Sequence, residues 1–304
     1  MKLKGIFLNS PAWKKFLLLI WFICISFIIT YGFSLITAYA FWGSKILDTA
    51  FLSDMSNPES IGVMKYLQAF NSIGMFLIPA LLLAWIAFPD TKSYFGTNTR
   101  ISPFKILLVI LLALSMLPIS NMLAELNQSV SFPDSLSGLE AFLRRSEKEA
   151  EELTHMFINA QSLPVLLLNI FIIAVIPAVA EEFFFRGALQ NLFARLTKNS
   201  HTAIFITAFV FSIIHFQFFS FTPRFFLGIV FGYLMYNTGN IWVPVIAHFI
   251  NNAAAIIVYY MITSNQLSPE AEHIGNSATL AWFAVGFVVS VFAFYAVCRK
   301  KQTT

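Results

Sequence analysis

Charged side chains are scarce in this 304-residue chain, in which Asp, Glu, Lys and Arg together make up 11% of the residues. Soluble domains carry roughly a quarter of such residues. Hydrophobic residues account for 58% of the chain, more than the average soluble domain contains. The composition therefore excludes an ordinary water-soluble protein and indicates an integral membrane protein.

Cysteine is nearly absent. Cys24 lies inside an apolar run, and Cys298 precedes the basic residues at the C-terminus. Two such distant cysteines provide neither a disulfide framework nor a Cys-type metal motif. Redox chemistry and a cysteine-held metal are therefore excluded as functions of this chain.

Long apolar runs dominate the sequence, and most of them reach the roughly 20 helical residues that cross a hydrocarbon core about 30 Å thick. The first run is longer than the roughly 7–15 apolar residues of a cleaved signal peptide, so we expect an uncleaved first helix. The predicted fold class is all-α, a polytopic membrane helical bundle of about eight transmembrane helices with a short sixth helix. The expected spans are residues 16–42, 66–88, 104–124, 165–195, 201–219, 223–237, 240–262 and 277–298.

These spans divide the chain into three parts. Residues 1–164 hold the N-terminal transmembrane helices and, at about 125–164, a segment with apolar residues at helical spacing. We expect that segment to form an amphipathic helix outside the bilayer, which covers the bundle or lies on the headgroups. Residues 165–262 form a helical core that contains the intramembrane polar residues, and residues 263–304 add a last transmembrane helix and a basic tail.

Lysine and arginine lie between the apolar runs and at the termini, without the basic stripe typical of nucleic-acid binding. A cytoplasmic N-terminus places twelve of them inside and six outside, with Arg186 counted separately as intramembrane. This bias predicts a multi-pass protein of a bacterial-type cell membrane with both termini in the cytoplasm. The inner residues are Lys2, Lys4, Lys14, Lys15, Lys92, Arg100, Lys105, Arg195, Lys198, Arg299, Lys300 and Lys301, and the outer ones are Lys45, Lys65, Arg144, Arg145, Lys148 and Arg224.

Two adjacent carboxylates, Glu181 and Glu182, stand in an apolar stretch and are followed by Arg186. Intramembrane charges are costly, so they normally face the bundle interior, pair with one another and mark function. Residues four apart share a helix face, so Glu182 can pair with Arg186 and leave Glu181 free as a base. Pro177, four residues before Glu181, favours a kink beside the carboxylate.

Further polar residues follow on the next helices, namely His215, His248 and Asn252. Counted from the expected cytoplasmic turns, Glu181 and His215 each lie roughly 22 Å deep, and Asn252 lies roughly 20 Å deep, at 1.5 Å per residue. Four polar side chains on three helices can therefore meet at one depth. Together they could activate a water molecule with a carboxylate and a histidine, and stabilise an oxyanion with a second histidine and an amide.

Three motifs carry a resemblance to a known family: Glu181-Glu182-x-x-x-Arg186, Phe211-x-x-x-His215 and His248-x-x-x-Asn252. With Phe-Phe-Arg-Gly at 184–187 and Thr-Gly-Asn-Ile-Trp at 238–242, they resemble the CPBP family over roughly residues 165–260. That family comprises CAAX prenyl endopeptidases and bacteriocin-processing, immunity or abortive-infection-like proteins.

The resemblance implies a glutamic intramembrane endopeptidase. It implies that Glu181 and His215 activate water, that His248 and Asn252 form the oxyanion site, and that Glu182 and Arg186 support them. The expected partners are a membrane-associated or lipidated protein or peptide as the substrate and the lipid bilayer, with no nucleic acid and no cofactor. The segments outside 165–260 leave open whether the substrate is a prenylated tail, a peptide precursor or another membrane protein.

Other interpretations of the same residues stay open. Glu181, His215 and His248 could hold a zinc ion in a metallopeptidase, although the chain lacks H-E-x-x-H. Glu181, Glu182 and Arg186 could form an ion network that only joins helices, in a catalytically silent scaffold or immunity protein. A transporter is also conceivable, because Pro177 and Pro244 interrupt apolar helices, but no inverted repeat accompanies them.

Overall fold

The computed structural model describes residues 4–299, and all of its regular structure is helical. Lys2, Lys300 and Lys301, which enter the count of basic residues, lie outside the described residues. Within residues 4–299, seven helical stretches are long and apolar enough to cross a membrane: Ala12–Leu47, Pro58–Ala87, Pro103–Gln128, Leu163–Thr197, Phe218–Thr238, Trp242–Thr263 and Ser277–Cys298. The predicted fold class, a polytopic helical membrane bundle, is confirmed.

The sequence predicts that the sixth span, residues 223–237, is the short one. This prediction is wrong, because the short helix lies in the fifth expected span, residues 201–219. Helix α11 (Ser200–Ile213) has only 14 residues, whereas the stretch Phe218–Thr238, which contains α12 (Phe221–Thr238), is long enough to cross. The reason is local. Phe216 adopts a positive φ of 53°, and this backbone conformation, which continues no right-handed helix, ends α11 next to His215.

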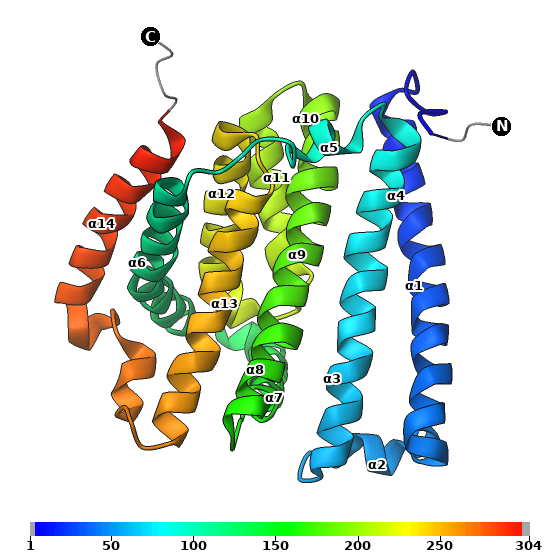
Figure 1. Cartoon of the computed structure of the whole chain (residues 1–304). Coiled ribbons are helices and arrows are strands. Elements are labelled where there is room, and N and C mark those ends of the chain that lie inside the picture. The colour runs from blue at the N-terminus through cyan, green and yellow to red at the C-terminus, as the bar shows by residue number, and fades with distance from the viewer. Residues whose placement is uncertain (1–3, 300–304) are drawn as a thin grey trace.

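The helices form three groups that lie side by side (Figure 1). At one edge, α1 (Ala12–Trp42) packs along α3 (Pro58–Ser72) and α4 (Ile78–Ala87). At the other edge, α6 (Pro103–Gln128) packs against α14 (Leu280–Cys298). Between them stand α8 (Leu163–Asn169), α9 (Ile176–Glu182), α10 (Gln190–Thr197), α11, α12 and α13 (Trp242–Thr263). This central group carries all the candidate site residues.

The helix that contains the two glutamates is irregular at two places. Pro177 has no N–H to donate, and the turn before it, Ile170–Val175, widens into a π-helix. A second π-helical turn, Phe183–Leu189, follows the glutamates and contains Arg186. The sequence predicts a kink near Pro177, and the structure has a π-helical turn before that residue. The second π-helical turn, which contains Arg186, was not predicted.

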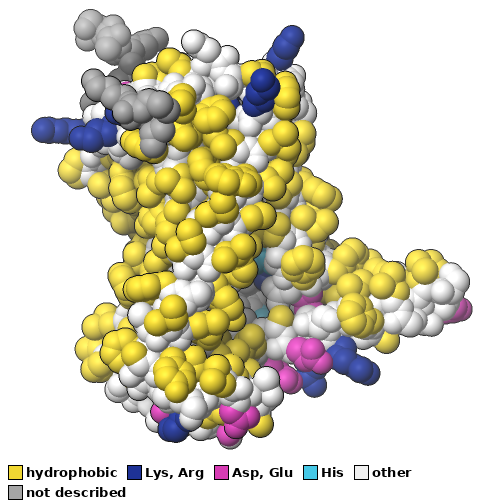
Figure 2. Space-filling view, turned by 90° about the vertical axis from the view of Figure 1, so that its right-hand side faces the viewer, with side chains coloured by type: hydrophobic (Ala, Val, Ile, Leu, Met, Phe, Trp, Pro, Cys, Tyr) yellow, Lys and Arg dark blue, Asp and Glu magenta, His cyan; other side chains and the backbone are white. Residues whose placement is uncertain are grey.

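The surface of the bundle suits a lipid environment. Figure 2 shows hydrophobic side chains over most of the visible face, with charged side chains at the two ends. The described ends of the chain lie at the same end of the bundle, at its two opposite edges, while α7 (Ser137–Ile158) and the segment between α13 and α14 lie at the other end (Figure 1). Seven long helices and one short one therefore build a multi-pass integral membrane protein.

Helix α7 occupies the segment for which the sequence predicts an amphipathic helix. Its residues Leu139 and Phe142 are 48% and 64% exposed. Glu140 accepts a hydrogen bond from the backbone N–H of Phe132 at 2.7 Å and binds Arg144 at 2.8 Å. These contacts fasten the start of α7 to the preceding loop, and they hold the pKa of the Glu140 carboxyl below its usual range.

Candidate active site

A buried network of three charged or titratable side chains joins three helical segments. The Oε1 atom of Glu182 accepts a hydrogen bond from Arg186 Nη1 at 2.8 Å and another from His248 Nδ1, also at 2.8 Å. Glu182 is fully buried and Arg186 is 1% exposed. Buried charges of this kind persist only when they are paired and hydrogen-bonded. The predicted Glu182–Arg186 pair is confirmed, and its link to His248 is an addition that the sequence did not predict.

Arg186 is held by more than its carboxylate partner. Its Nη2 atom donates to the carbonyl of Gly228 on α12 at 3.2 Å, and its guanidinium lies 4.6 Å from the ring centre of Phe211 and 5.4 Å from that of Phe231. Cation–π contacts with desolvated rings partly replace the lost hydration of the guanidinium. Arg186 thus fixes the distance between the glutamate helix and α12.

His215 lies just after α11, half-buried, with its ring oriented by one hydrogen bond. Its Nδ1 atom is 2.8 Å from the carbonyl oxygen of Phe211. A carbonyl oxygen can only accept, so Nδ1 carries the proton. The neutral imidazole then presents an unprotonated Nε2, which can accept a proton or a hydrogen bond from water.

The phenyl ring of Phe211 contacts the imidazole rings of both His215 and His248. Its centroid lies 5.4 Å from the His215 ring and 6.0 Å from the His248 ring. His248 also stacks on Phe231 at 5.3 Å. Aromatic neighbours on both sides restrict the imidazole rings to one orientation. The sequence did not identify Phe231 as a site residue, because it lies in an apolar run in which nothing distinguishes it from its neighbours.

Glu181 differs from its neighbour in having no hydrogen-bond partner within residues 4–299. It is half-buried and lies within electrostatic range of His248, Glu182, Arg186 and Arg224. The structure therefore divides the two carboxylates as expected. Glu182 is committed to its partners, and Glu181 is free.

Asn252 lies one helical turn after His248 on α13 and is half-buried. Its only side-chain hydrogen bond among the described residues is with Asn251, whose Nδ2 donates to Asn252 Oδ1 at 3.4 Å. The structure brings Glu182, Arg186 and His248 into direct contact and places Glu181 beside them. It shows no hydrogen bond that joins Asn252 or His215 to Glu181.

The part of the chain that the structure describes contains no group of three His, Cys, Asp or Glu side chains arranged to hold a metal ion. The alternative zinc set of Glu181, His215 and His248 is not such a group. His248 instead uses its Nδ1 for Glu182. The zinc interpretation gains no support from this arrangement.

The comparison with protein families matches residues 163–254 to the model described as "Type II CAAX prenyl endopeptidase Rce1-like". Residues 163–254 belong to the Rce1-like type II CAAX prenyl endopeptidase family. The Rce1-like segment contains Glu181, Glu182, Arg186, His215, His248 and Asn252, and it leaves the first three long helices and α14 outside. No curated protein and no solved structure matches the chain.

The Rce1-like match confirms the resemblance predicted from the three motifs, which extended over roughly residues 165–260. It also implies that the chain is a protease, with protein or peptide substrates. The role of each site residue must come from the geometry of this chain, because a family match does not assign roles.

Proposed function

We propose that the chain is an intramembrane endopeptidase in which Glu181 and His215 activate the attacking water. The observation that carries this proposal is the difference between the two adjacent glutamates. Glu182 Oε1 accepts hydrogen bonds from Arg186 and His248, each at 2.8 Å, and only its Oε2 lacks a partner within residues 4–299. Neither oxygen of Glu181 has a hydrogen-bond partner in that part of the chain. A carboxylate without a hydrogen-bond partner within residues 4–299, in a site that also presents a histidine with an unprotonated Nε2, suits general-base catalysis.

The reaction is a hydrolysis and needs only the substrate and water. Glu181 takes one proton from the water while the water oxygen bonds to the carbonyl carbon, and His215 Nε2 orients the water by accepting a hydrogen bond from its second O–H group. The C–N bond then breaks, and Glu181 returns its proton to the departing amine. The products are a carboxylate and an amine, and both side chains regain their starting states after loss of the remaining proton to solvent.

The negative charge on the carbonyl oxygen needs donors while the tetrahedral intermediate exists. The Asn252 amide is a donor in every protonation state. His248 already donates from Nδ1 to Glu182, so its Nε2 can donate only in the imidazolium form. We therefore assign oxyanion stabilisation to Asn252 and to His248 as an imidazolium.

The substrate class follows from the family name and from the apolar surroundings. The name of the matched family specifies a prenylated protein with a C-terminal Cys-aliphatic-aliphatic-X sequence. A lipid-modified tail concentrates in the bilayer, where it can reach a site between transmembrane helices. We therefore propose a membrane-associated, lipidated protein or peptide as the substrate of this chain.

The test of this function compares the membrane proteomes of cells that contain the wild-type protein or Glu181→Ala. The expected result is a peptide terminus, identified by mass spectrometry, that is present only with the wild-type protein. Glu149→Ala serves as the matched control, since Glu149 is an exposed glutamate on α7 and should leave that terminus unchanged. Identical termini with wild-type protein and Glu181→Ala, together with an unaltered cellular phenotype, would favour a silent scaffold.

A further inference from the structure

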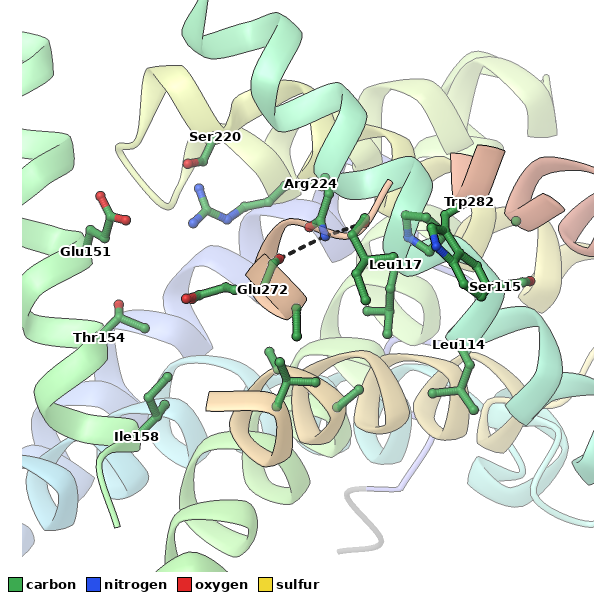
Figure 3. A pocket seen from close by; sticks show the side chains of 18 of the residues that line it. Leu114, Ser115, Leu117, Glu151, Thr154, Ile158, Ser220, Arg224, Glu272 and Trp282 are labelled. Atoms are coloured by element: carbon green, nitrogen blue, oxygen red, sulfur yellow. Dashed lines mark hydrogen bonds between the residues drawn. The ribbon is translucent and has the colours of Figure 1, made fainter. Parts of the chain in front are cut away.

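A cavity that is separate from the Glu181 centre lies between α6, α7, α12, α13 and α14 (Figure 3). Its volume is about 710 Å³, and none of the six candidate site residues lines it. Its side walls are apolar and come from α6, α13 and α14, for example at Leu114, Val258 and Val285. Its lining residues on α7 and in the segment before α14 place it toward the end of the bundle that carries α7, and Figure 1 shows that end opposite the described chain ends. A volume of this size admits a short peptide.

Acidic and basic side chains line different parts of this cavity. Glu151 on α7 and Glu272, in the segment before α14, line it and are exposed. Arg224, near the start of α12, is half-buried, and Figure 3 shows its guanidinium directed into the cavity. The cavity thus has acidic groups at its rim and a cation on its inner wall.

Arg224 is poorly compensated for a half-buried cation. Its Nη2 atom donates to Gln217 Oε1, but its Nη1 atom is buried and has no hydrogen-bond partner within residues 4–299. No carboxylate of that region lies within 4.0 Å of it. A charged donor that is desolvated without a partner is costly, and an anionic ligand would offset that cost.

The nearest candidate for a partner, Glu147, has another task. Its carboxylate accepts hydrogen bonds from the backbone N–H of Phe219 at 3.1 Å and from the Ser220 hydroxyl. It therefore fastens α7 to the turn before α12, and it interacts with Arg224 only at longer range. The Arg224 guanidinium therefore lines the cavity without a carboxylate partner at salt-bridge distance within residues 4–299.

Arg224 also connects the cavity with the Glu181 centre. It lies within electrostatic range of both Glu181 and His215, and its partner Gln217 is two residues after His215. Three residues of extended chain span at most about 10 Å. A peptide whose scissile bond is at Glu181 could therefore extend its last residues along the apolar walls and place its end near Arg224.

We infer that Arg224 binds the C-terminal α-carboxylate of the peptide substrate, and that the cavity holds the few residues after the scissile bond. This inference rests on the proposed endopeptidase function. A peptide carboxylate fits better than a lipid phosphate, because Arg224 lies on the inner wall of a cavity of about 710 Å³ between helices, a volume that admits a few peptide residues. Arg224 is thus a binding residue that selects substrates cleaved near their C-terminus.

The test uses purified full-length protein in neutral detergent and two farnesylated peptides that end in Cys-Val-Ile-Ala, one with a free C-terminal carboxylate and one with a C-terminal amide. The wild-type protein should cleave the carboxylate form with a kcat/KM about 10- to 100-fold higher, since the difference is one hydrogen-bonded ion pair with a buried guanidinium. Arg224→Gln should reduce cleavage of the carboxylate form to the rate of the amide form. It should leave cleavage of the amide form near the wild-type rate, which also shows that the variant is folded.

Arg145→Gln is the matched control, because Arg145 is exposed on α7 and does not line the cavity; it should preserve the discrimination. Equal cleavage of both peptides by the wild-type protein, or undiminished discrimination by Arg224→Gln, would overturn the carboxylate subsite and leave the endopeptidase function intact. An Arg224→Gln effect seen only in phosphatidylglycerol liposomes, without discrimination between the peptides, would assign Arg224 to a lipid phosphate and also overturn it. Cleavage of neither peptide by the wild-type protein would count against the proposed function itself.

Discussion

Glu182 on α9 and His248 on α13 share a 2.8 Å hydrogen bond between side chains that are almost completely buried. The same Glu182 oxygen also accepts from Arg186, so one carboxylate holds together the glutamate helix and α13. This contact explains why two glutamates stand side by side. One of them builds the site, and the other remains available for chemistry.

The first prediction concerns stability. Glu182→Ala should lower the yield and the thermal stability of folded protein more than Glu181→Ala does, because it leaves the Arg186 cation buried without its partner. Removing one member of a buried pair costs about 3–5 kcal/mol, and Arg186→Ala should show a similar loss. Thermal unfolding in detergent measures the difference. If the three variants unfold at the same temperature, the division of roles between Glu181 and Glu182 is wrong.

The second prediction separates water activation from oxyanion binding. His215→Ala should reduce single-turnover cleavage by about 10²–10⁴-fold, as expected for loss of an acid–base group. Asn252→Ala should reduce it by about 10²–10³-fold, because Glu181 and His215 still activate water when one oxyanion donor is missing. Single-turnover rates prevent slow product release from hiding the chemistry. Wild-type rates for both variants would show that neither side chain touches the reacting atoms.

The third prediction tests the close packing of α12. A Cβ added at Gly232 would lie 2.8 Å from Cγ2 of Ile204 on α11 and 3.0 Å from Oε1 of Gln190. Overpacking of this kind typically costs about 1–3 kcal/mol, so Gly232→Ala should lower the unfolding temperature. Gly32 on α1 has open space around its Cβ position, and Gly32→Ala should not lower it. Equal destabilisation by the two substitutions would contradict the packing at α11 and α12.

The fourth prediction concerns orientation in the membrane. Topology reporters fused after residue 304 and near residue 198 should be cytoplasmic, and one near residue 135 should lie across the membrane, because the basic residues concentrate on the expected inner side. The described chain ends already lie at one end of the bundle, opposite α7 (Figure 1). A translocated C-terminal reporter would reverse the topology and would place α7 in the cytoplasm.

Much of the bundle could be predicted because intramembrane polar residues are few and apolar runs are long. Helical spacing alone paired Glu182 with Arg186, which are four residues apart. The contact between Glu182 and His248 could not be found this way, because it depends on the rotation of α13 about its axis, and depth along an axis does not determine rotation. The end of α11 at Ile213 was also missed, because hydrophobicity continues through Phe216 while the backbone turns there.

Arg224 illustrates a second limit. As a basic residue at a helix start, it was counted among the outer charges that set membrane orientation, and nothing in its neighbours separated it from them. Only the packing of five helical segments shows that its guanidinium faces a cavity and has an unpaired donor. The composition of a segment predicts where it lies in a membrane, whereas the pairing of one side chain depends on the tertiary structure.

The most direct test of the central claim is single-turnover cleavage of a defined lipidated peptide by Glu181→Gln in detergent or liposomes. The amide nearly matches the carboxylate in size and still forms hydrogen bonds, so the variant should fold and bind the peptide with wild-type affinity. It cannot take a proton from water, and cleavage should fall by about 10²–10⁴-fold or more. Cleavage by Glu181→Gln at close to the wild-type rate would contradict the assignment of Glu181 as the catalytic base.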